Sequence, residues 1–434
     1  MKKNFIYFIF FCCIFNFKIS YAALKIDINE GTIEPMPVAV AEFTASSWDE
    51  KQISRDLTDV ILSDLEGSAL FRCVDRASFL EHVSLDKKLG YHNWRKINVV
   101  AVIGGSVQFL EHGKVSVQFK IWDPYKEAMV DGMAYTIQKK SWRRLAHKIA
   151  DRIYQKMTGE TGYFDTRILF ISHIGKGKNV KKRLAIMDQD GANLKFLTDG
   201  KHLVLTPRFD PKNQRAIYMS YENKIPRIYI LDIERGWQRL IGNFKGISFA
   251  PRFSPDGAKA IMSVANRGST NIFEVDLESN HASKLTSDIG AINTSPSYSP
   301  DGQKIIFNSD RAGSRQLYVM DRDGSNIRRV SFGTGSYATP VWSPRGDLIA
   351  FTKIEGGTFY IGVMRPDGSK ERLLTTSWLD EGPTWSPNGR VIMFTRQKPD
   401  NTSYIYSVDV TGYNEKLIST FSGASDPAWS PLLK

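Results

Sequence analysis

The sequence predicts a small α/β domain followed by an all-β, six-bladed β-propeller, with four antiparallel strands in each blade. Three observations lead to this prediction. A short motif, typified by "SPSYSPDGQKIIFNSD", occurs six times at separations of 43 to 45 residues. Each full copy continues through apolar segments of strand length, and the sixth copy stops after its first strand. A fixed period of this size with four short strands is typical of a propeller blade.

The first residues are typical of a secretory signal peptide. A basic start and the apolar run 5–17 precede "SYA" (20–22), a triplet with small residues at both ends. We predict a signal peptide over residues 1–22, with cleavage after Ala22 or after Ala23. A single-pass anchor is the alternative, but the run is short for crossing a bilayer. No second stretch of spanning length follows, so we expect no direct membrane insertion.

Removal of this peptide changes the charge and the cysteine count. It takes away three lysines and no acidic residue, so the net charge falls from +12 to +9. Cys73 remains as a single cysteine in a strand-like segment, and we expect a small buried apolar side chain rather than a nucleophile. The basic segment 175–183 is expected to be a solvated hairpin loop. Because no basic run is interleaved with aromatic residues, we expect no nucleic-acid partner.

Residues 23–35 form a separate short segment. Leu24, Ile26 and Ile28 alternate with polar residues, which indicates a strand, and the glycine and prolines that follow detach it from the next element. An amphipathic strand of this kind can add to the edge of another sheet. Pairing within its own domain is the alternative that the pattern leaves open.

Residues 36–160 lack the repeat and predict the α/β domain. Strands are expected at 36–43, 98–110, 114–123 and 129–138, and helices at 53–68 and 141–159. Gly159 can end the second helix. Gly104 and Gly105 are expected to mark a bulge or close packing, because no phosphate-binding motif surrounds them.

Residues 163–434 carry the repeat. The prolines that open its copies are Pro207, Pro251, Pro296, Pro340, Pro383 and Pro427. In each copy an aromatic residue is followed by a Ser-Pro-Asp-Gly turn or a relative of it, in which proline and glycine fit the backbone angles of a tight reversal. The last copy supplies one strand only, and segments matching the second, third and fourth strands begin at residue 166. We therefore predict that one blade is built from both ends of the repeat region and closes the ring without a free sheet edge.

The chain shows no set of residues with the spacing of a catalytic or metal site. Neither G-x-S-x-G nor HExxH occurs, and the seven histidines lack ligand spacing. "DQDG" and "DRDG" resemble the start of a calcium loop, but glycine comes at the fourth position, so both are expected to be hairpin turns. Asp380 and Glu381 are the one acidic pair just before a first strand, and a single pair is weak support for a glycosidase. We predict no cofactor and no metal.

The order of these parts, the junction "MTGETGYFDTRILFIS" and the ending in "PAWSP" resemble the TolB family of periplasmic proteins in the Tol–Pal system of Gram-negative envelopes. The resemblance covers essentially the whole chain after the signal peptide. Departures from the repeat at Asp210, Lys212, Asn213 and Arg345 affect only turn residues. The resemblance implies a periplasmic, non-enzymatic protein that helps to keep the outer membrane intact and supports envelope constriction at cell division.

The resemblance also implies partners and sites. The Pal lipoprotein is expected at one mouth of the propeller, and the C-terminal domain of TolA at the mature N-terminal strand; translocation segments of bacteriocins are a further implied partner. The implied TolA-binding residues are Leu24, Lys25, Ile26, Asp27, Ile28, Asn29, Glu30, Gly31, Thr32 and Ile33. The implied Pal-binding residues, expected in loops that lead into the first strands, are Leu205, Thr206, Ile247, Ser248, Ala250, Asn293, Thr294, Ser295, Tyr337, Thr339, Asp380, Glu381, Ser425 and Asp426.

A propeller-type hydrolase, or a propeller attached to a peptidase, is the competing prediction. The peptidase would need a catalytic domain after the ring, whereas the given sequence ends within the sixth repeat.

Overall fold

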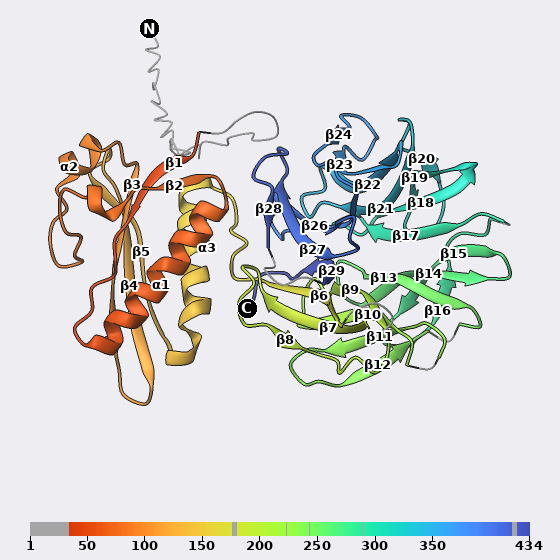
Figure 1. Ribbon diagram of the computed structural model, residues 1–434, viewed down its shortest axis with the longest axis horizontal. Coiled ribbons are helices and arrows are strands. Elements are labelled where there is room, and N and C mark those ends of the chain that lie inside the picture. The colour runs from red at the N-terminus through yellow and green to blue at the C-terminus, as the bar shows by residue number, and fades with distance from the viewer. Residues whose placement is uncertain (1–33, 176–179, 223, 243, 289, 419–422) are drawn as a thin grey trace, which may run out of the picture.

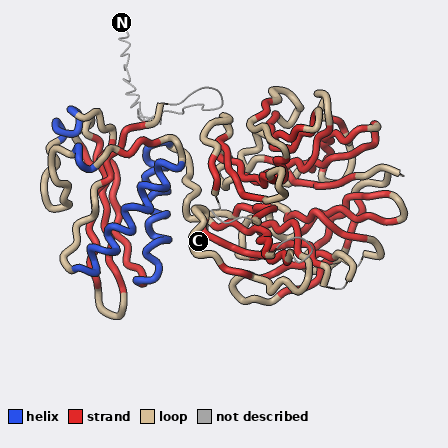
Figure 2. The backbone as a smooth tube through the Cα atoms, viewed as in Figure 1, coloured by secondary structure: helices blue, strands red, loops and turns tan. Residues whose placement is uncertain are grey.

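The computed structural model describes residues 34–175, 180–222, 224–242, 244–288, 290–418 and 423–434. It consists of an α/β domain beside a ring of four-stranded sheets (Figure 1), and the helices are confined to the α/β domain (Figure 2). The predicted signal peptide and the predicted strand from Leu24 to Ile33 lie outside the described residues.

The α/β domain is a mixed five-stranded sheet in the order β2-β1-β3-β4-β5. Its strands are β1 (Met36–Val40), β2 (Phe71–Cys73), β3 (Ala101–Phe109), β4 (Lys114–Asp123) and β5 (Ala128–Gln138). Strand β1 pairs in parallel with both β2 and β3, and the remaining pairs are antiparallel. The helices α1 (Trp48–Gly67) and α3 (Trp142–Thr158) bury their apolar residues against one face, while α2 (Tyr91–Lys96) lies over the other. Two short 3₁₀ turns complete the domain, at Arg76–Ser78 and Lys139–Ser141.

Helix α1 begins five residues before the predicted start at residue 53. Ser47 is its N-cap: the Ser47 hydroxyl accepts a bond from the backbone of Glu50, and the Glu50 carboxylate accepts one from the backbone of Ser47. This reciprocal capping box satisfies backbone donors that the helix leaves free. The apolar periodicity starts only at Ile53, so it could not locate the polar first turn.

Three local predictions for this domain are confirmed. Gly159 ends α3 in the left-handed conformation, with φ of 77°. A Cβ atom on Gly104 would lie 2.3 Å from a methyl carbon of Val83, and one on Gly105 would lie 2.4 Å from the Gln118 carbonyl oxygen, so both glycines serve close packing. Cys73 is half-buried against the apolar core, and burial raises the pKa of its thiol to about 12, which keeps it unreactive.

The ring contains six antiparallel sheets of four strands, as predicted. The first two uninterrupted blades are β9 (Val204–Phe209), β10 (Arg215–Ser220), β11 (Arg227–Asp232), β12 (Gln238–Ile241), then β13 (Ile247–Phe253), β14 (Lys259–Asn266), β15 (Ser269–Asp276) and β16 (Ala282–Lys284). The next two are β17 (Asn293–Tyr298), β18 (Lys304–Ala312), β19 (Ser314–Asp321), β20 (Arg328–Arg329), then β21 (Ser336–Trp342), β22 (Ile349–Glu355), β23 (Thr358–Met364) and β24 (Arg372–Leu373). The fifth is β25 (Leu379–Trp385), β26 (Val391–Gln397), β27 (Ser403–Asp409) and β28 (Lys416–Leu417).

The sixth sheet, here called the seam blade, joins the two ends of the repeat region. It has the order β29-β6-β7-β8, with β29 (Ala424–Trp429), β6 (Arg167–Ile174), β7 (Lys181–Asp188) and β8 (Lys195–Phe196). Strand β29 pairs antiparallel with β6, and the Ser430 backbone donates to the Arg167 carbonyl at 2.9 Å. The predicted closure of the ring is therefore confirmed.

The departures from the repeat do not disrupt its turns. Where other copies have serine, the Asp210 carboxylate accepts bonds from the backbones of Lys212 and Asn213 at 2.8 and 3.1 Å, which closes the reversal. The "DQDG" and "DRDG" segments are hairpin turns at the ends of β7 and β19, as predicted.

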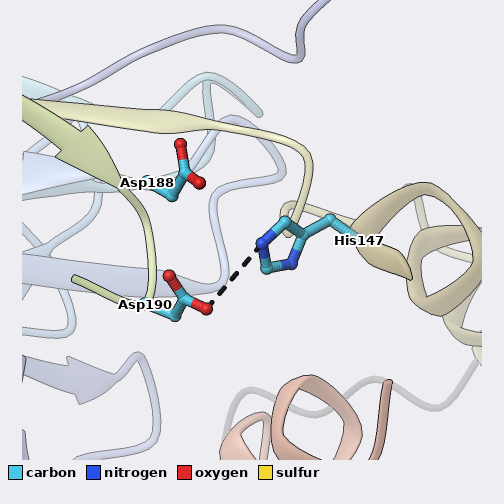
Figure 3. Close-up of side chains that lie close together, drawn as sticks. All are labelled: His147, Asp188 and Asp190. Atoms are coloured by element: carbon cyan, nitrogen blue, oxygen red, sulfur yellow. Dashed lines mark ion pairs between the residues drawn. The ribbon is translucent and has the colours of Figure 1, made fainter. Parts of the chain in front are cut away.

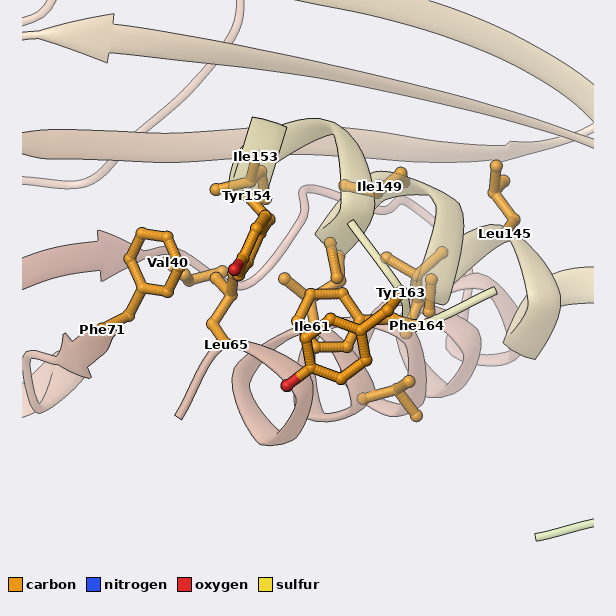
Figure 4. Close-up of a cluster of buried hydrophobic side chains, with 14 of the residues drawn as sticks. Val40, Ile61, Leu65, Phe71, Leu145, Ile149, Ile153, Tyr154, Tyr163 and Phe164 are labelled. Atoms are coloured by element: carbon orange, nitrogen blue, oxygen red, sulfur yellow. The ribbon is translucent and has the colours of Figure 1, made fainter. Parts of the chain in front are cut away.

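An aromatic linker connects the α/β domain to the seam blade. Tyr163 and Phe164 pack edge-on against Tyr154 of α3, and Tyr163 also contacts the ring of Trp429 in β29. Figure 4 shows the linker pair among side chains of α1 and α3. One apolar core thus runs from the domain into the seam blade, and the chain's C-terminus lies at this junction (Figure 1).

Candidate functional site

The end of the ring where the first strands begin, here called the mouth, has the same backbone irregularity in every blade. Each first strand shifts register against its second strand just before the motif proline. The residue before that proline has φ between +47° and +67° in all six blades; these residues are Thr206, Ala250, Ser295, Thr339, Gly382 and Asp426. Five of them are not glycine, so this is an unusual conformation held in place by the surrounding sheet. A bulge of this kind changes where side chains point at the rim of a sheet.

The strands start earlier than the sequence analysis expected. The predicted Pal-binding residues were placed in loops, but they lie inside the first strands, either ahead of the bulge or within it. The reason is that each second strand continues far enough to pair with them, as Ser309 does with Asn293.

Burial also narrows the predicted set, because five of its side chains are buried and are not presented to a partner. They are Ser248, Asn293, Tyr337, Asp380 and Ser425. Several make internal polar contacts instead: the Asn293 amide donates to the Thr270 carbonyl at 3.2 Å, and the Tyr337 hydroxyl donates to Glu371 at 2.9 Å. Partner binding at the mouth stays a prediction. It now rests on those predicted Pal-binding residues that are partly or fully exposed.

The acidic pair at residues 380 and 381 is not arranged for acid–base chemistry. The Asp380 carboxylate is buried and accepts two bonds from the Arg396 guanidinium and one from the Thr375 hydroxyl, each at 2.7 Å. The hydrogen-bonding capacity of this carboxylate is therefore used by partners within the protein. Glu381, by contrast, is exposed.

Charged groups of the fifth and seam blades meet at the mouth. Although Glu381 as a whole is exposed, partial desolvation of its carboxyl group by neighbouring residues and the nearby Asp426 carboxylate raise its pKa. Burial and the neighbouring Lys182 lower the pKa of His173 to about 4, and its ring nitrogen Nε2 lies 2.9 Å from the Ser425 hydroxyl. His173 is therefore neutral near pH 7, and this side of the mouth has an acidic character from Glu381 and Asp426.

Exposed apolar side chains surround the mouth, and the sequence analysis missed most of them. Each uninterrupted blade places one in the segment that leads into its first strand. We call this set the apolar rim; its members, with their exposed fractions, are Leu203 (39%), Ile247 (45%), Ile292 (47%), Phe332 (71%) and Trp378 (62%). Clusters of exposed apolar residues often mark protein-binding surfaces. In the sequence, a hydrophobic residue a few positions before a motif proline is the feature that could have located this rim.

A second group of polar residues lies between the two domains. His147 of α3 faces Asp188 and Asp190 at the end of β7 (Figure 3), although these residues are far apart in the sequence. His147 Nε2 lies 3.8 Å from the Asp190 carboxylate, and His147 Nδ1 donates to Asp64 at 2.6 Å. Burial alone would lower the pKa of His147, but the Asp64 and Asp190 carboxylates outweigh it and raise that pKa.

The contacts of this trio favour an ionic link between domains over a metal site. Arg143 donates to the same Asp190 carboxylate oxygen that faces His147, so a cation already neutralises it. Asp188 is engaged by the Asn193 amide at 2.6 Å, and Gln189 donates to Asp64 at 2.8 Å. The group therefore ties the β7 hairpin of the propeller to helices α1 and α3.

These features define a class: a six-bladed β-propeller fused to a small α/β domain, with an apolar rim at one mouth. Comparisons with known proteins give the family. Residues 154–433 match the model of the TolB β-propeller domain, and residues 24–130 match the model of the TolB amino-terminal domain. The chain belongs to the TolB family.

Two similar proteins support this assignment over nearly the whole length. The Tol–Pal system protein TolB of Gluconobacter oxydans (strain 621H) is 44% identical over 413 residues, which cover 94% of this chain and 88% of the relative. The crystal structure of TolB from Acinetobacter baumannii superposes with a TM-score of 0.81 at 25% identity, covering 92% of this chain and 97% of that one. Both similar proteins are TolB proteins, and neither is described as an enzyme.

Proposed function

We propose that this protein is a non-enzymatic periplasmic adaptor of the Tol–Pal system. It binds the Pal lipoprotein through the propeller mouth and the C-terminal domain of TolA through its mature N-terminal strand. By linking the two it helps to maintain outer-membrane integrity and supports constriction of the envelope at division. Membership of the TolB family supports the assignment of this protein to the Tol–Pal system and to the periplasm. Among the described residues, no helix is both long and apolar enough to cross a membrane.

The apolar rim is the main observation in favour of partner binding at the mouth. Phe332 and Trp378 are among the most exposed large apolar residues of the described chain, with 71% and 62% of their surface accessible. Leaving such side chains in water is unfavourable, and covering them with a partner gives about 25 cal/mol for each Å² of apolar area buried. Both side chains are carried by the rigid scaffold of the propeller. Partner binding would therefore immobilise few residues and cost little conformational entropy.

The mouth is tested by replacing Trp378 with alanine and measuring the affinity for purified Pal by calorimetry. Buried aromatic anchors at interfaces commonly contribute 2 kcal/mol or more, so we expect Kd to rise by about 30-fold. Tyr413→Ala is the matched control, because Tyr413 is 57% exposed on a turn at the opposite end of the ring. Equal affinities of the two variants would contradict the assignment of the mouth.

The N-terminal strand is tested by removing residues 23–33 from the mature protein. TolA binding should be lost, because the added strand is gone, while Pal binding should persist, because the mouth is built by the propeller. Calorimetry with both purified partners measures each effect separately. Unchanged affinity for the TolA domain would refute the role of this strand.

A hydrolase remains the competing function, and it is weakened by the contacts of Asp380. A general acid or base needs a carboxyl group that can exchange protons with a substrate, whereas Asp380 is enclosed by Arg396 and Thr375. Turnover of glycoside or peptide substrates by the purified protein, abolished by Glu381→Gln, would support the hydrolase and overturn the adaptor.

A further inference from the structure

The positions directly after the six motif prolines line the central channel. They are Arg208, Arg252, Ser297, Val341, Thr384 and Ala428. The repeat makes these positions equivalent in the backbone, yet their side chains differ in size and charge. Two neighbouring blades supply arginine, two supply a hydroxyl group and two supply a small apolar group. A structural requirement of the repeat would favour the same residue in each blade, so this variation indicates a local role.

The channel widens here into a cavity of about 430 Å³ at the turn end of the ring, opposite to the mouth. Its wall includes the aromatic residue and the turn proline of each blade, so the cavity has an apolar surface with a few polar groups. Pockets for small molecules have volumes of roughly 300–1,000 Å³ and this same character.

Among the described residues, no carboxylate lies within ion-pair distance of either arginine in this cavity. Arg208 donates through Nη1 to its own neighbour, the Pro207 carbonyl, at 2.6 Å. Arg252 makes no side-chain hydrogen bond or ion pair with any residue of the described chain. Burial lowers the pKa of Arg208, and the charge of the more distant Asp426 carboxylate only partly offsets this effect. Burial also lowers the pKa of Arg252, and the charge of Arg208 lowers it further. Two partly buried cations next to each other in the channel repel one another, and a negative charge between them would relieve this repulsion.

Three other arginines of this propeller are paired with carboxylates. Arg390 donates to Asp409 at 2.6 Å, Arg396 to Asp380 at 2.7 Å, and Arg215 to Asp210 at 2.7 Å. In these three places the chain supplies a carboxylate at hydrogen-bond distance, whereas Arg208 and Arg252 face the channel without one. The two guanidinium groups are therefore available to a negative charge that comes from outside the chain.

We propose that this cavity, here called the arginine pocket, binds a small-molecule oxyanion, a carboxylate or a phosphate, between Arg208 and Arg252. Guanidinium groups match both kinds of oxyanion through paired N–H donors. The hydroxyls of Ser297 and Thr384 line the same cavity and accept bonds from the backbones of Trp342 and Trp429 at 3.4 and 3.3 Å, so each retains a proton that it can donate into the cavity. The aromatic wall contacts the apolar part of an organic ligand. This site is separate from the mouth and does not depend on the proposed partners.

The test is calorimetry of the mature protein with inorganic phosphate and with succinate, at constant ionic strength in a chloride buffer. We expect saturable binding of at least one of the two probes, and the preferred probe identifies the kind of oxyanion. Arg252→Gln should weaken it by at least tenfold, and so should Arg208→Gln. Arg328→Gln is the matched control, since it removes the same charge from the exposed strand β20 and should leave Kd within twofold.

A second measurement separates ligand binding from a structural role. In chloride alone, Arg252→Gln should melt at the same temperature as the natural protein or higher, because it removes an uncompensated charge. A variant that melts well below the natural protein would show that Arg252 serves the fold and would overturn the proposal. Absence of saturable binding of either probe, or equal binding by Arg252→Gln, would overturn it as well.

Discussion

The seam blade and its neighbour β25–β28 have the same four-stranded pattern but are held in different ways. Trp385 and Trp429 occupy the same position in their first strands, and both are buried. The indole of Trp385 donates to the Val341 carbonyl of the preceding blade at 3.0 Å. The indole of Trp429 donates to the Thr166 hydroxyl at 2.8 Å, a residue 263 positions away in the sequence.

The difference shows that closure of the ring and attachment of the α/β domain depend on the same group of contacts. Tyr163 packs against Trp429, and Phe164 belongs to the same core as α1 and α3. Asp151 of α3 also accepts bonds from the Phe164 and Asp165 backbones, at 2.7 and 3.0 Å. In a continuous blade, the contacts with neighbouring blades are separate from one another. In the seam blade, strand β29, the linker and the α/β domain share the same contacts.

The largest effect should come from removing the closing strand. Deletion of residues 426–434 takes away most of β29 together with Trp429, whose loss alone should cost about 3–5 kcal/mol. It also leaves the edge of β6 unpaired, which favours aggregation. We expect an insoluble protein or a strongly lowered Tm. Deletion of residues 431–434 is the control, since it keeps β29; a similar Tm for both truncations would mean that the two ends do not close the ring.

Replacing each of the two tryptophans with alanine sharpens the comparison. Both variants should lose about 3–5 kcal/mol in denaturant unfolding, because each removes a buried indole and its hydrogen bond. Only Trp429→Ala should also loosen the linker, so limited proteolysis should cut between residues 159 and 166 faster in that variant. Equal cleavage in Trp385→Ala would show that the linker is held independently of the seam.

The seam blade should add a dependence on pH through His173, at a position where its neighbour has a glutamine. His173 has a pKa of about 4 in the folded protein, below the usual value near 6.5, because burial and Lys182 disfavour its charged form. The unfolded chain therefore binds the proton more readily, and stability should fall as the pH drops from about 6.5 to 4. The contribution is on the order of 1–3 kcal/mol.

The variant His173→Gln tests this contribution, because glutamine already occupies the equivalent position in the neighbouring blade. Gln397 occupies the equivalent position of β26, since His173 and Gln397 each follow by five residues the partner of the strand's tryptophan. The variant should lose less stability than the natural protein between pH 6.5 and 4, measured by denaturant unfolding at each pH. Parallel curves for the two proteins would contradict the assignment.

The smallest effect is expected for the ion pair between the linker and the fourth blade, β21–β24. Glu160 accepts a bond from Arg345 at 2.9 Å, and both side chains are partly exposed. Pairs of this kind contribute up to about 1 kcal/mol, so Glu160→Gln should change unfolding free energy by less than that. A larger loss would mean that charge, rather than aromatic packing, holds the linker.

Much of this architecture could be predicted because the repeat is a local signal. The proline positions, the turn residues and the apolar strands each lie within a few residues of one another, so the number of blades and the split blade followed from spacing alone. Helix α1 was placed late because its first turn is polar and depends on the capping pair Ser47 and Glu50. The predicted mouth residues fell in strands rather than loops because strand pairing at the mouth depends on the neighbouring strand, which local patterns do not report.

By itself the sequence determined the fold class, the order of the domains and the closure of the ring by its own last strand, since these follow from periodicity and short-range turn chemistry. Only the tertiary structure decided which side chains share a space. It placed His147 beside Asp190, enclosed Asp380 with Arg396, exposed the apolar rim and brought Arg208 and Arg252 together in the channel, with no ion-paired carboxylate among the described residues. The physical reason is that charge pairing and burial depend on distances between residues remote in the chain, and only the packed ring sets those distances.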